Sequence, residues 1–259
     1  MDLGIKGRVA MVAAGSKGIG LASARALAAE GCKVSICGRT QETIDKAVSE
    51  IGHGAKGHVA DVSKLEDLKS WFKQTEAELG AVQILVTNTG GPPAGNVMDL
   101  TDEQWEAGVQ STLMNVVRMV RLAAPGMKAA KWGRVIHITS LVAKEPAKFL
   151  PISSTLRTGL MSLTKLQAYE LAQDGITVNG VLPGHTDTDR QQHLIHVRAD
   201  KEGISLEESA KQQAETTAMK RFARPEEIGD VVAFLCSERA SYISGVSLLV
   251  DGATTCAFG

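Results

Sequence analysis

Three glycines near the start of the chain have the spacing of a phosphate-binding loop. They lie in Ala13-Ala14-Gly15-Ser16-Lys17-Gly18-Ile19-Gly20, between an apolar run and an amphipathic stretch. Glycines in such a turn let the backbone approach a pyrophosphate, and the N–H groups at the start of the following helix face its negative charge. A glycine run alone is often only a turn, but this strand-to-helix context favours a dinucleotide site. The residues predicted to bind the cofactor here are Gly15, Ser16, Lys17, Gly18, Ile19 and Gly20.

The end of the next apolar run, residues 33–37, indicates which dinucleotide is bound. A carboxylate at this point would hold the ribose 2′-hydroxyl of NAD. The chain instead has Cys37-Gly38-Arg39-Thr40. Arg39 can hold a 2′-phosphate with two charge-assisted hydrogen bonds, and Lys17 can add a second positive charge. The alternative is that Arg39 is only a solvated loop cation. We predict NADP(H) as the cofactor.

These residues need a framework, and the chain supplies one by alternating apolar runs with longer amphipathic stretches. Strands are predicted at 8–13, 33–37, 56–60, 84–87, 134–139, 177–182 and 247–250. Helices are predicted at 18–30, 41–50, 64–79, 102–127, 153–173 and 225–237. No linker or repeat divides the 259 residues. The predicted fold class is therefore α/β, with one Rossmann-type domain over residues 1–259 built on a doubly wound parallel sheet of seven strands.

Residues 185–220 differ from the rest because they are polar and rich in Gln, Glu, Thr and His. They lie between the last two predicted strands, where insertions usually overhang the ligand crevice of a parallel sheet. We predict two helices that form a small lid. The alternative is a solvated excursion with no role at the site.

Composition and charge exclude several classes of function. Lys plus Arg number 28 and Asp plus Glu 29, a net charge of −1, which gives no reason to expect nucleic acid or an anionic membrane as a partner. No apolar run approaches the roughly 20 residues of a membrane helix, and the N-terminus lacks the pattern of a signal peptide. The four cysteines form no Cys-x-x-Cys pair, so we expect no metal site and a cytoplasmic protein.

Further motifs make the chain resemble the short-chain dehydrogenase/reductase family, within it the 3-oxoacyl-carrier-protein reductase-like group. They are Asp61-Val62, Thr87-Asn88-Thr89-Gly90, Pro183-Gly184 with Thr188, Arg224-Pro225-Glu226-Glu227-Ile228, and the segment from Ser244-Gly245 to Val250-Asp251-Gly252. The resemblance spans nearly the whole chain. It implies cofactor contacts from Asp61, Val62, Asn88, Gly90, Pro183, Gly184 and Thr188.

The phosphate loop departs from the family pattern at one position. The family's Thr-Gly-x-x-x-Gly-x-Gly has its first glycine where this chain has Ala14. Gly15, the next residue, is expected to restore the turn. Cofactor binding is therefore predicted to survive.

The catalytic positions depart much further. The resemblance implies four of them, at which the family has Ser, Tyr, Lys and Asn. Counting along the chain places Ser140 at the Ser position, Ser153 at the Tyr position, Arg157 at the Lys position and Thr112 at the Asn position. The downstream Gly159-Leu160-Met161-Ser162-Leu163-Thr164-Lys165 fixes this register.

These replacements change the chemistry. A serine hydroxyl is a far weaker acid than a phenol, and an arginine stays protonated, so the family's proton relay cannot operate unchanged. Neither of the chain's two tyrosines is a good substitute: Tyr169 lies about four helical turns from Ser153, and the segment around Tyr242 resembles a packing turn of the family. His185 has an ordinary pKa suited to proton transfer, and Lys144 is a weaker candidate; each can equally be an ordinary loop residue.

The sequence leaves more than one function open. The first hypothesis is an NADP(H)-dependent oxidoreductase that reduces a small-molecule ketone or oxidises a secondary alcohol, with Arg157 also binding the cofactor ribose. The alternative is an NADP-binding non-catalytic member, either a sensor or a partner subunit of an active homologue. A different chemistry, such as dehydration or aldol-type cleavage, is a third. The resemblance further implies a homotetramer, and no charge cluster in the sequence names the substrate.

Overall fold

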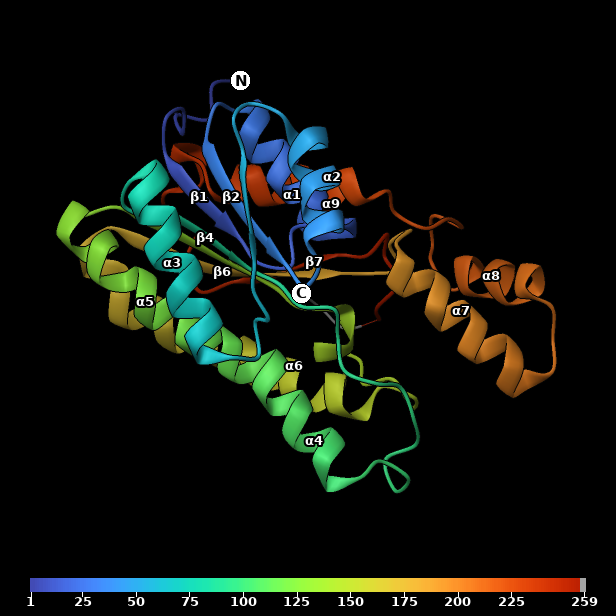
Figure 1. Cartoon of the computed structure of the whole chain (residues 1–259). Helices are drawn as coiled ribbons and strands as arrows, with labels where there is room; N and C mark the ends of the chain where they lie inside the picture. Colours follow the sequence, from blue (N-terminus) through green and yellow to red (C-terminus); the bar gives the residue numbers. More distant parts are fainter. Residues whose placement is uncertain (257–259) are drawn as a thin grey trace.

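The computed structural model describes residues 1–256 and has one seven-stranded sheet in the order β3-β2-β1-β4-β5-β6-β7, with every neighbouring pair parallel (Figure 1). The strand order reverses direction between β1 and β4, which makes the sheet doubly wound. The predicted fold class is confirmed. The strands are β1 (Val9–Val12), β2 (Lys33–Gly38), β3 (Lys56–Val59), β4 (Ile84–Thr87), β5 (Gly133–Ile138), β6 (Ile176–Pro183) and β7 (Ser247–Val250).

Successive residues of the central strands point into two separate cores. Ala10 and Val12 belong to one core, packed under the helices α1, α2 and α9, whereas Val9 and Met11 belong to the other, under α3, α5 and α6. A sheet covered on both faces needs apolar residues at every position, which explains the continuous apolar runs of the sequence. These helices are α1 (Gly18–Ala29), α2 (Gln41–Ile51), α3 (Leu65–Leu79), α5 (Asn115–Ala130), α6 (Pro151–Leu171) and α9 (Pro225–Leu235).

The predicted helix over 102–127 is helical throughout but is not a single α-helix. It consists of α4 (Asp102–Gly108), a wide π-helical turn η1 (Val109–Met114), and α5. The Thr101 side chain caps its start by accepting a hydrogen bond from the backbone N of Gln104. At Gly108 a Cβ would lie 2.4 Å from Ile152 Cγ2, so the helix approaches the start of α6 closely there. Such π-turns often occur at functional sites.

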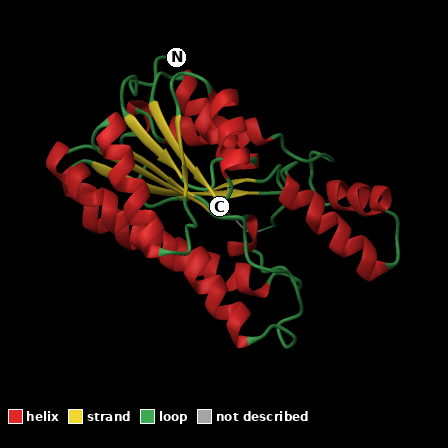
Figure 2. Cartoon of the chain, in the orientation of Figure 1, coloured by secondary structure: helices red, strands yellow, loops and turns green. Residues whose placement is uncertain are grey.

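Two helices in residues 185–220 are confirmed, namely α7 (Asp189–Glu202) and α8 (Leu206–Glu215). They project from the body of the domain as an antiparallel pair (Figure 2). The far end of α7 is nevertheless tied back, since Lys201 Nζ donates to Asn96 Oδ1 at 3.1 Å and lies 3.6 Å from the centre of the Phe149 ring. Among the described residues, no helix is both long enough and apolar enough to span a bilayer.

Candidate active site

The predicted site residues gather at the carboxyl edge of the sheet. Because all strands run in the same direction, the loops that follow β1, β2, β4, β5 and β6 leave the sheet along one rim. Those loops hold respectively the phosphate loop, Arg39, Asn88, Ser140 and the Pro183–Thr188 segment. The fold therefore brings together residues that lie far apart in the sequence.

Ala14, which stands where the family has a glycine, adopts the turn conformation itself. Its φ is 46°, in the left-handed region, whereas Gly15 keeps a negative φ. The expectation that Gly15 restores the turn is therefore wrong: Gly15 is needed for space, because a Cβ there would lie 2.8 Å from Ile36 Cγ2. A non-glycine residue in this region carries a strain of roughly 1 kcal/mol, which the hydrogen bonds of the neighbouring backbone must offset.

The start of α1 suits a bound phosphate. Lys17 occupies the cap position but its side chain makes no capping hydrogen bond, and the first turn holds no acidic residue. The backbone N–H groups there remain available to an anion. Gly18 has φ 52°, and a Cβ on it would lie 3.1 Å from Thr188 Cγ2, so the predicted contact residues Gly18 and Thr188 face each other. The residues present fit the pyrophosphate of a dinucleotide.

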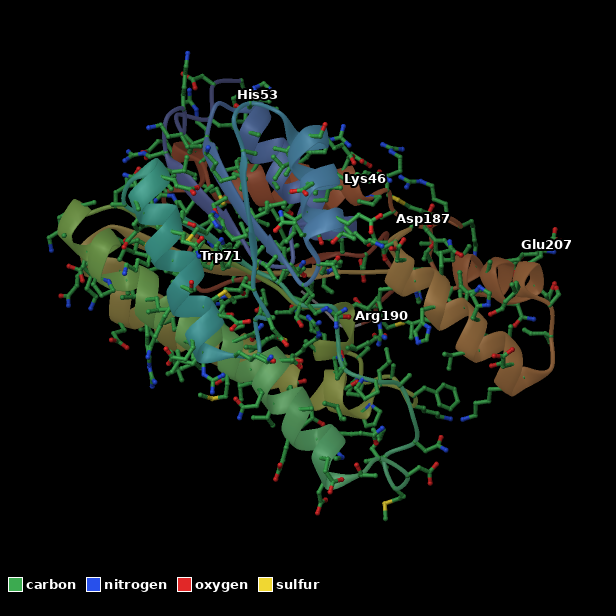
Figure 3. All side chains as sticks on the ribbon, viewed as in Figure 1. Lys46, His53, Trp71, Asp187, Arg190 and Glu207 are labelled. Atoms are coloured by element: carbon green, nitrogen blue, oxygen red, sulfur yellow. The ribbon has the colours of Figure 1, made fainter. Side chains whose placement is uncertain are left out.

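Arg39 follows the end of β2, next to a hollow lined by charged residues. Arg39 is exposed and makes no ion pair within residues 1–256. Ser16 lies beside it, since a Cβ on Gly38 would be 2.9 Å from Ser16 Oγ. An adjoining hollow of about 270 Å³ is lined by two lysines, Lys17 and Lys46, and by two carboxylates, Glu50 and Asp189 (Figure 3 labels Lys46).

Asp61 lies two residues beyond the end of β3, and Asn88 directly follows β4. Asp61 Oδ1 accepts hydrogen bonds from the backbone N and the hydroxyl of Ser63, and although burial alone would raise its pKa, these bonds hold the pKa below its usual value. Asn88 Nδ2 lies 3.4 Å from the carbonyl oxygen of Ala14 and so links the end of β4 to the phosphate loop. Gly184 is crowded against β7, because a Cβ there would lie 2.7 Å from Asp251 Cα.

Ser153 and Arg157 form a buried pair one helical turn apart on α6. Both are only 6% exposed. Arg157 Nε donates to Ser153 Oγ at 3.1 Å, and its Nη1 donates to the carbonyl oxygen of Ile138, the last residue of β5, also at 3.1 Å. Arg157 Nη2 makes no hydrogen bond within residues 1–256 and retains access to solvent. Burial lowers the pKa of Arg157 to about 10, with a further contribution from the charge of Arg190, and the guanidinium stays charged at neutral pH.

Ser140 lies two residues beyond Ile138 and begins the short helix η2 (Leu141–Ala143). Its Oγ accepts a long hydrogen bond, 3.3 Å, from the backbone N of Val142. The hydroxyl proton is free for another acceptor. Ser140 therefore lies two residues beyond the Ile138 carbonyl that Arg157 contacts.

Thr112 lies in η1, which packs against α6, and its buried Oγ1 has no hydrogen-bond partner. Asn115, one turn further on, was not identified from the sequence. Its Oδ1 accepts from the backbone N of Val116, while its buried Nδ2 is also without a partner. Unsatisfied buried groups are rare and are usually served by a water or a ligand. The sequence feature that could have identified Asn115 is its amide side chain three residues after Thr112, on the same face of the helix.

His185 lies against the helical pair. Its Nδ1 is 3.3 Å from Gln191 Oε1, an acceptor, so this nitrogen carries the proton, and its ring packs at 6.1 Å from that of Phe222. Burial lowers the pKa of His185 below its ordinary value. The two tyrosines lie away from the site: Tyr169 is 70% exposed and Tyr242 is fully exposed.

Arg190, in the first turn of α7, was also not identified from the sequence. Its Nη2 donates to the carbonyl oxygen of Pro92 at 2.8 Å, in the loop after β4. It is partly buried, and burial lowers its pKa. The only signal in the sequence was a cation two residues after Thr188, and the contact with Pro92 depends on the fold.

With this geometry in place, comparison with known proteins gives a consistent answer. The sequence profile of the family described as Enoyl-(Acyl carrier protein) reductase matches residues 13–255. The D-beta-hydroxybutyrate dehydrogenase of Cupriavidus necator is 32% identical over 252 residues, which cover 96% of this chain and 98% of that relative. The chain belongs to the short-chain dehydrogenase/reductase family. It is an oxidoreductase of that type with a Rossmann nucleotide-binding fold.

Other short-chain dehydrogenases/reductases agree. Human dehydrogenase/reductase SDR family member 4 is 35% identical over 251 residues, covering 95% of this chain and 87% of that relative. Among solved structures, L-sorbose reductase from Gluconobacter frateurii, complexed with NADPH and L-sorbose, has a TM-score of 0.94 at 31% identity, with both chains covered completely. An actinorhodin polyketide ketoreductase with NADPH has a TM-score of 0.94 at 29% identity, covering 96% of this chain and 98% of that one. These relatives support a nicotinamide cofactor.

Proposed function

We propose that this short-chain dehydrogenase/reductase is an NADPH-dependent reductase of a small-molecule ketone, in which Ser153 and Arg157 take the catalytic positions. The observation that carries the proposal is the charge-assisted hydrogen bond of 3.1 Å between Arg157 Nε and Ser153 Oγ at the end of β5. It polarises the one hydroxyl at the family's proton-donor position. The reverse reaction, oxidation of a secondary alcohol, uses the same groups.

The cofactor would be held by the phosphate loop, by Asp61, Val62, Asn88 and Gly90, and by Pro183, Gly184 and Thr188. Arg39, supported by the cations around the neighbouring hollow, would select the phosphorylated ribose. NADPH, when bound, supplies the hydride that reduces the carbonyl carbon. Arg157 Nη2, which has no partner in residues 1–256, is available to the ribose or to the substrate.

Ser153 and Ser140 act on the substrate oxygen. Each hydroxyl donates a hydrogen bond to the carbonyl oxygen, and the guanidinium behind Ser153 stabilises the negative charge that develops there. Because Arg157 is buried and unpaired with any carboxylate in residues 1–256, its field acts at low effective dielectric. This arrangement replaces a phenol by polarised serine hydroxyls.

The final proton comes from water in this proposal. His185 is largely neutral at neutral pH, because burial lowers its pKa, so little of the protonated ring is present to donate the proton. Thr112 Oγ1 and Asn115 Nδ2, both buried without partners, can hold a water beside α6. His185 is then a residue that orders the helical pair.

The proposal is tested by NADPH oxidation with Ser153→Ala, using Ser154→Ala as the matched control. Ser154 is the adjacent buried serine, and its Oγ accepts from the backbone N of Ala147. We expect kcat to fall about 100-fold in Ser153→Ala, the usual effect of removing one such donor, and less than tenfold in the control. Equal effects of both variants, or no turnover of any ketone by the unaltered protein, would refute the proposal.

A homotetramer is also proposed. Large apolar side chains are exposed on α6 and near β7, namely Leu166, Tyr169, Val246 and Leu248. Burial of these residues between copies would remove them from water. Sedimentation of a monomer at micromolar concentration would contradict this assembly.

A further inference from the structure

Two arginines at the carboxyl rim of the sheet have no counter-ion within residues 1–256, and the charge of Arg190 lies close enough to Arg157 to lower the pKa of Arg157. Arg157 lies at the start of α6 and Arg190 at the start of α7. Neither forms an ion pair within residues 1–256, and neither has an interaction beyond those already described. Withdrawal of a charge from water is costly unless it is paired. Because Arg157 already serves the substrate oxygen and the cofactor in the proposed reaction, Arg190 is the cation left to pair with a negative group of the substrate.

The Arg190 side chain is fixed over the loop that follows β4. Besides its bond to the Pro92 carbonyl, its Nε lies 3.5 Å from the position that a Cβ would occupy on Gly91. The φ of residue 91 is 81°, which favours glycine, and a Cβ there would be in ordinary van der Waals contact with the guanidinium. Figure 3 shows Arg190 on the side of α7 that faces the body of the domain, whereas Glu207 lies on the far side with α8.

Asp187 and Asp189, which precede Arg190 in the chain, and Asp251, which follows β7, all make contacts with other groups. Asp189, the preceding residue, pairs with Lys17 at 2.9 Å. Asp187 Oδ1 accepts from Gln192 Nε2, and Asp251 accepts from the backbone N of Ala253 and Thr255. The Arg190 guanidinium uses only its Nη2 in the bond to Pro92, so its remaining N–H groups can bind both oxygens of one carboxylate.

We propose that Arg190 binds the carboxylate of the substrate, which is an oxo acid whose ketone oxygen lies toward Ser153 and Arg157. The inference rests on the proposed reductase function and names its substrate class. Arg190 then positions the acid, while the pair on α6 acts on the ketone. Because Arg190 belongs to α7, binding of the acid also ties the helical pair to the loop after β4.

The test compares acids with their uncharged esters in the complex of the full chain with NADP⁺, which cannot reduce them. The probes are 2-oxobutyrate, acetoacetate and levulinate, each with its methyl ester, titrated by calorimetry. Charged hydrogen bonds of this kind change affinity by about 10- to 100-fold. We expect at least one acid to bind at least tenfold more tightly than its ester.

Variants of Arg190 test whether this residue causes the preference for acids over esters. Arg190→Met should abolish it and leave NADP⁺ affinity within about twofold, and Arg190→Lys should keep only part of it, because the two-pronged geometry is lost. Arg198→Met is the matched control, since Arg198 lies on the same helix but pairs with Glu202 at 3.0 Å. This control should keep the full preference.

Three results would overturn the carboxylate site: no acid preferred over its ester, a preference that survives in Arg190→Met, or a loss of NADP⁺ binding in that variant. NADPH oxidation with the same pairs separates the two proposals. If the acids bind better than their esters through Arg190 but no ketone is reduced, the carboxylate site stands and the reductase proposal is refuted. If neutral ketones are reduced but acids are not preferred over their esters, the reductase proposal stands and the carboxylate site is refuted.

Discussion

Lys17 and Asp189, 172 positions apart in the chain, form an ion pair of 2.9 Å between Nζ and Oδ2. The pair joins the phosphate loop to the first residue of α7. Both side chains are largely exposed, so the pair itself contributes little stability. Its importance lies in position, because a bound phosphate and Asp189 would compete for the same lysine.

Removal of the carboxylate should therefore strengthen cofactor binding. In Asp189→Asn, Lys17 is free and one negative charge near the phosphates is lost. We expect the Kd of NADPH to fall two- to fivefold at low salt, which corresponds to the roughly 1 kcal/mol of an exposed pair, and the gain to vanish at high salt. Asp187→Asn, two residues away, should have no such effect. Weaker NADPH binding in Asp189→Asn would show instead that the ion pair holds α7 over the cofactor.

Cofactor preference should depend on Arg39. It is an exposed cation at the end of β2, without an ion pair in residues 1–256, next to Ser16 and the hollow that contains Lys46. Arg39→Leu should raise the Kd of NADPH about 10- to 100-fold, the range of a charge-assisted bond, and change that of NADH less than twofold. Lys56→Leu removes an equal charge at the amino end of the neighbouring strand β3 and serves as the control. Tighter binding of NADH than of NADPH by the unaltered chain would contradict the preference.

Local patterns were sufficient to predict most of the framework. Apolar runs such as residues 84–87 must be buried strands, and their order along the chain leaves few alternatives to a doubly wound sheet. The positions of Ser140, Ser153 and Arg157 followed from a fixed register with the family. The register could not give the conformation of Ala14, since adoption of φ 46° depends on whether the surrounding backbone can bear the strain.

The rest of the site depends on contacts between distant segments. Arg190 was an ordinary lid cation in the sequence; only the fold places it on the Pro92 carbonyl and close enough to Arg157 to lower that residue's pKa. The environment of Asn115 also could not be predicted from the sequence. An amide in an apolar helix gives no indication of whether its Nδ2 will find a partner, and the buried Nδ2 of Asn115 has none within residues 1–256.

His137, in the middle of the sheet, should make stability depend on pH. Its Nδ1 is 2.9 Å from Thr87 Oγ1 and its Nε2 is 2.9 Å from Gln167 Oε1. Full burial lowers the pKa of His137 to about 4. Between pH 6.5 and 4 the unfolded chain binds a proton that the folded chain does not, so the free energy of unfolding falls as the pH falls. The contribution is complete above pH 6.5, and about 3 kcal/mol of it is lost by pH 4.

Urea unfolding from pH 7 to pH 4 measures this slope. His137→Asn removes the titrating ring and should flatten the slope, whatever it does to stability at pH 7. His53→Asn, at an exposed turn, is the control and should leave the slope unchanged (Figure 3). An unchanged slope in His137→Asn would mean that other groups produce it. His185, whose pKa is also lowered by burial, contributes in the same direction.

Restoring the family's Tyr and Lys tests whether Ser153 and Arg157 form a catalytic centre or whether the protein is a non-catalytic member of the family. In Ser153→Tyr with Arg157→Lys, the 3.1 Å bond between the two residues and the bond to the Ile138 carbonyl are both lost. If those bonds position the reacting groups, turnover of the preferred ketone should fall at least tenfold, while NADPH binding and the melting temperature show that the variant is folded. Arg157→Lys alone keeps the positive charge, so its turnover of the ketone should fall less. A large gain in ketone reduction by the double variant would instead favour the non-catalytic alternative, because the remaining groups at the rim would then still be arranged for a phenol.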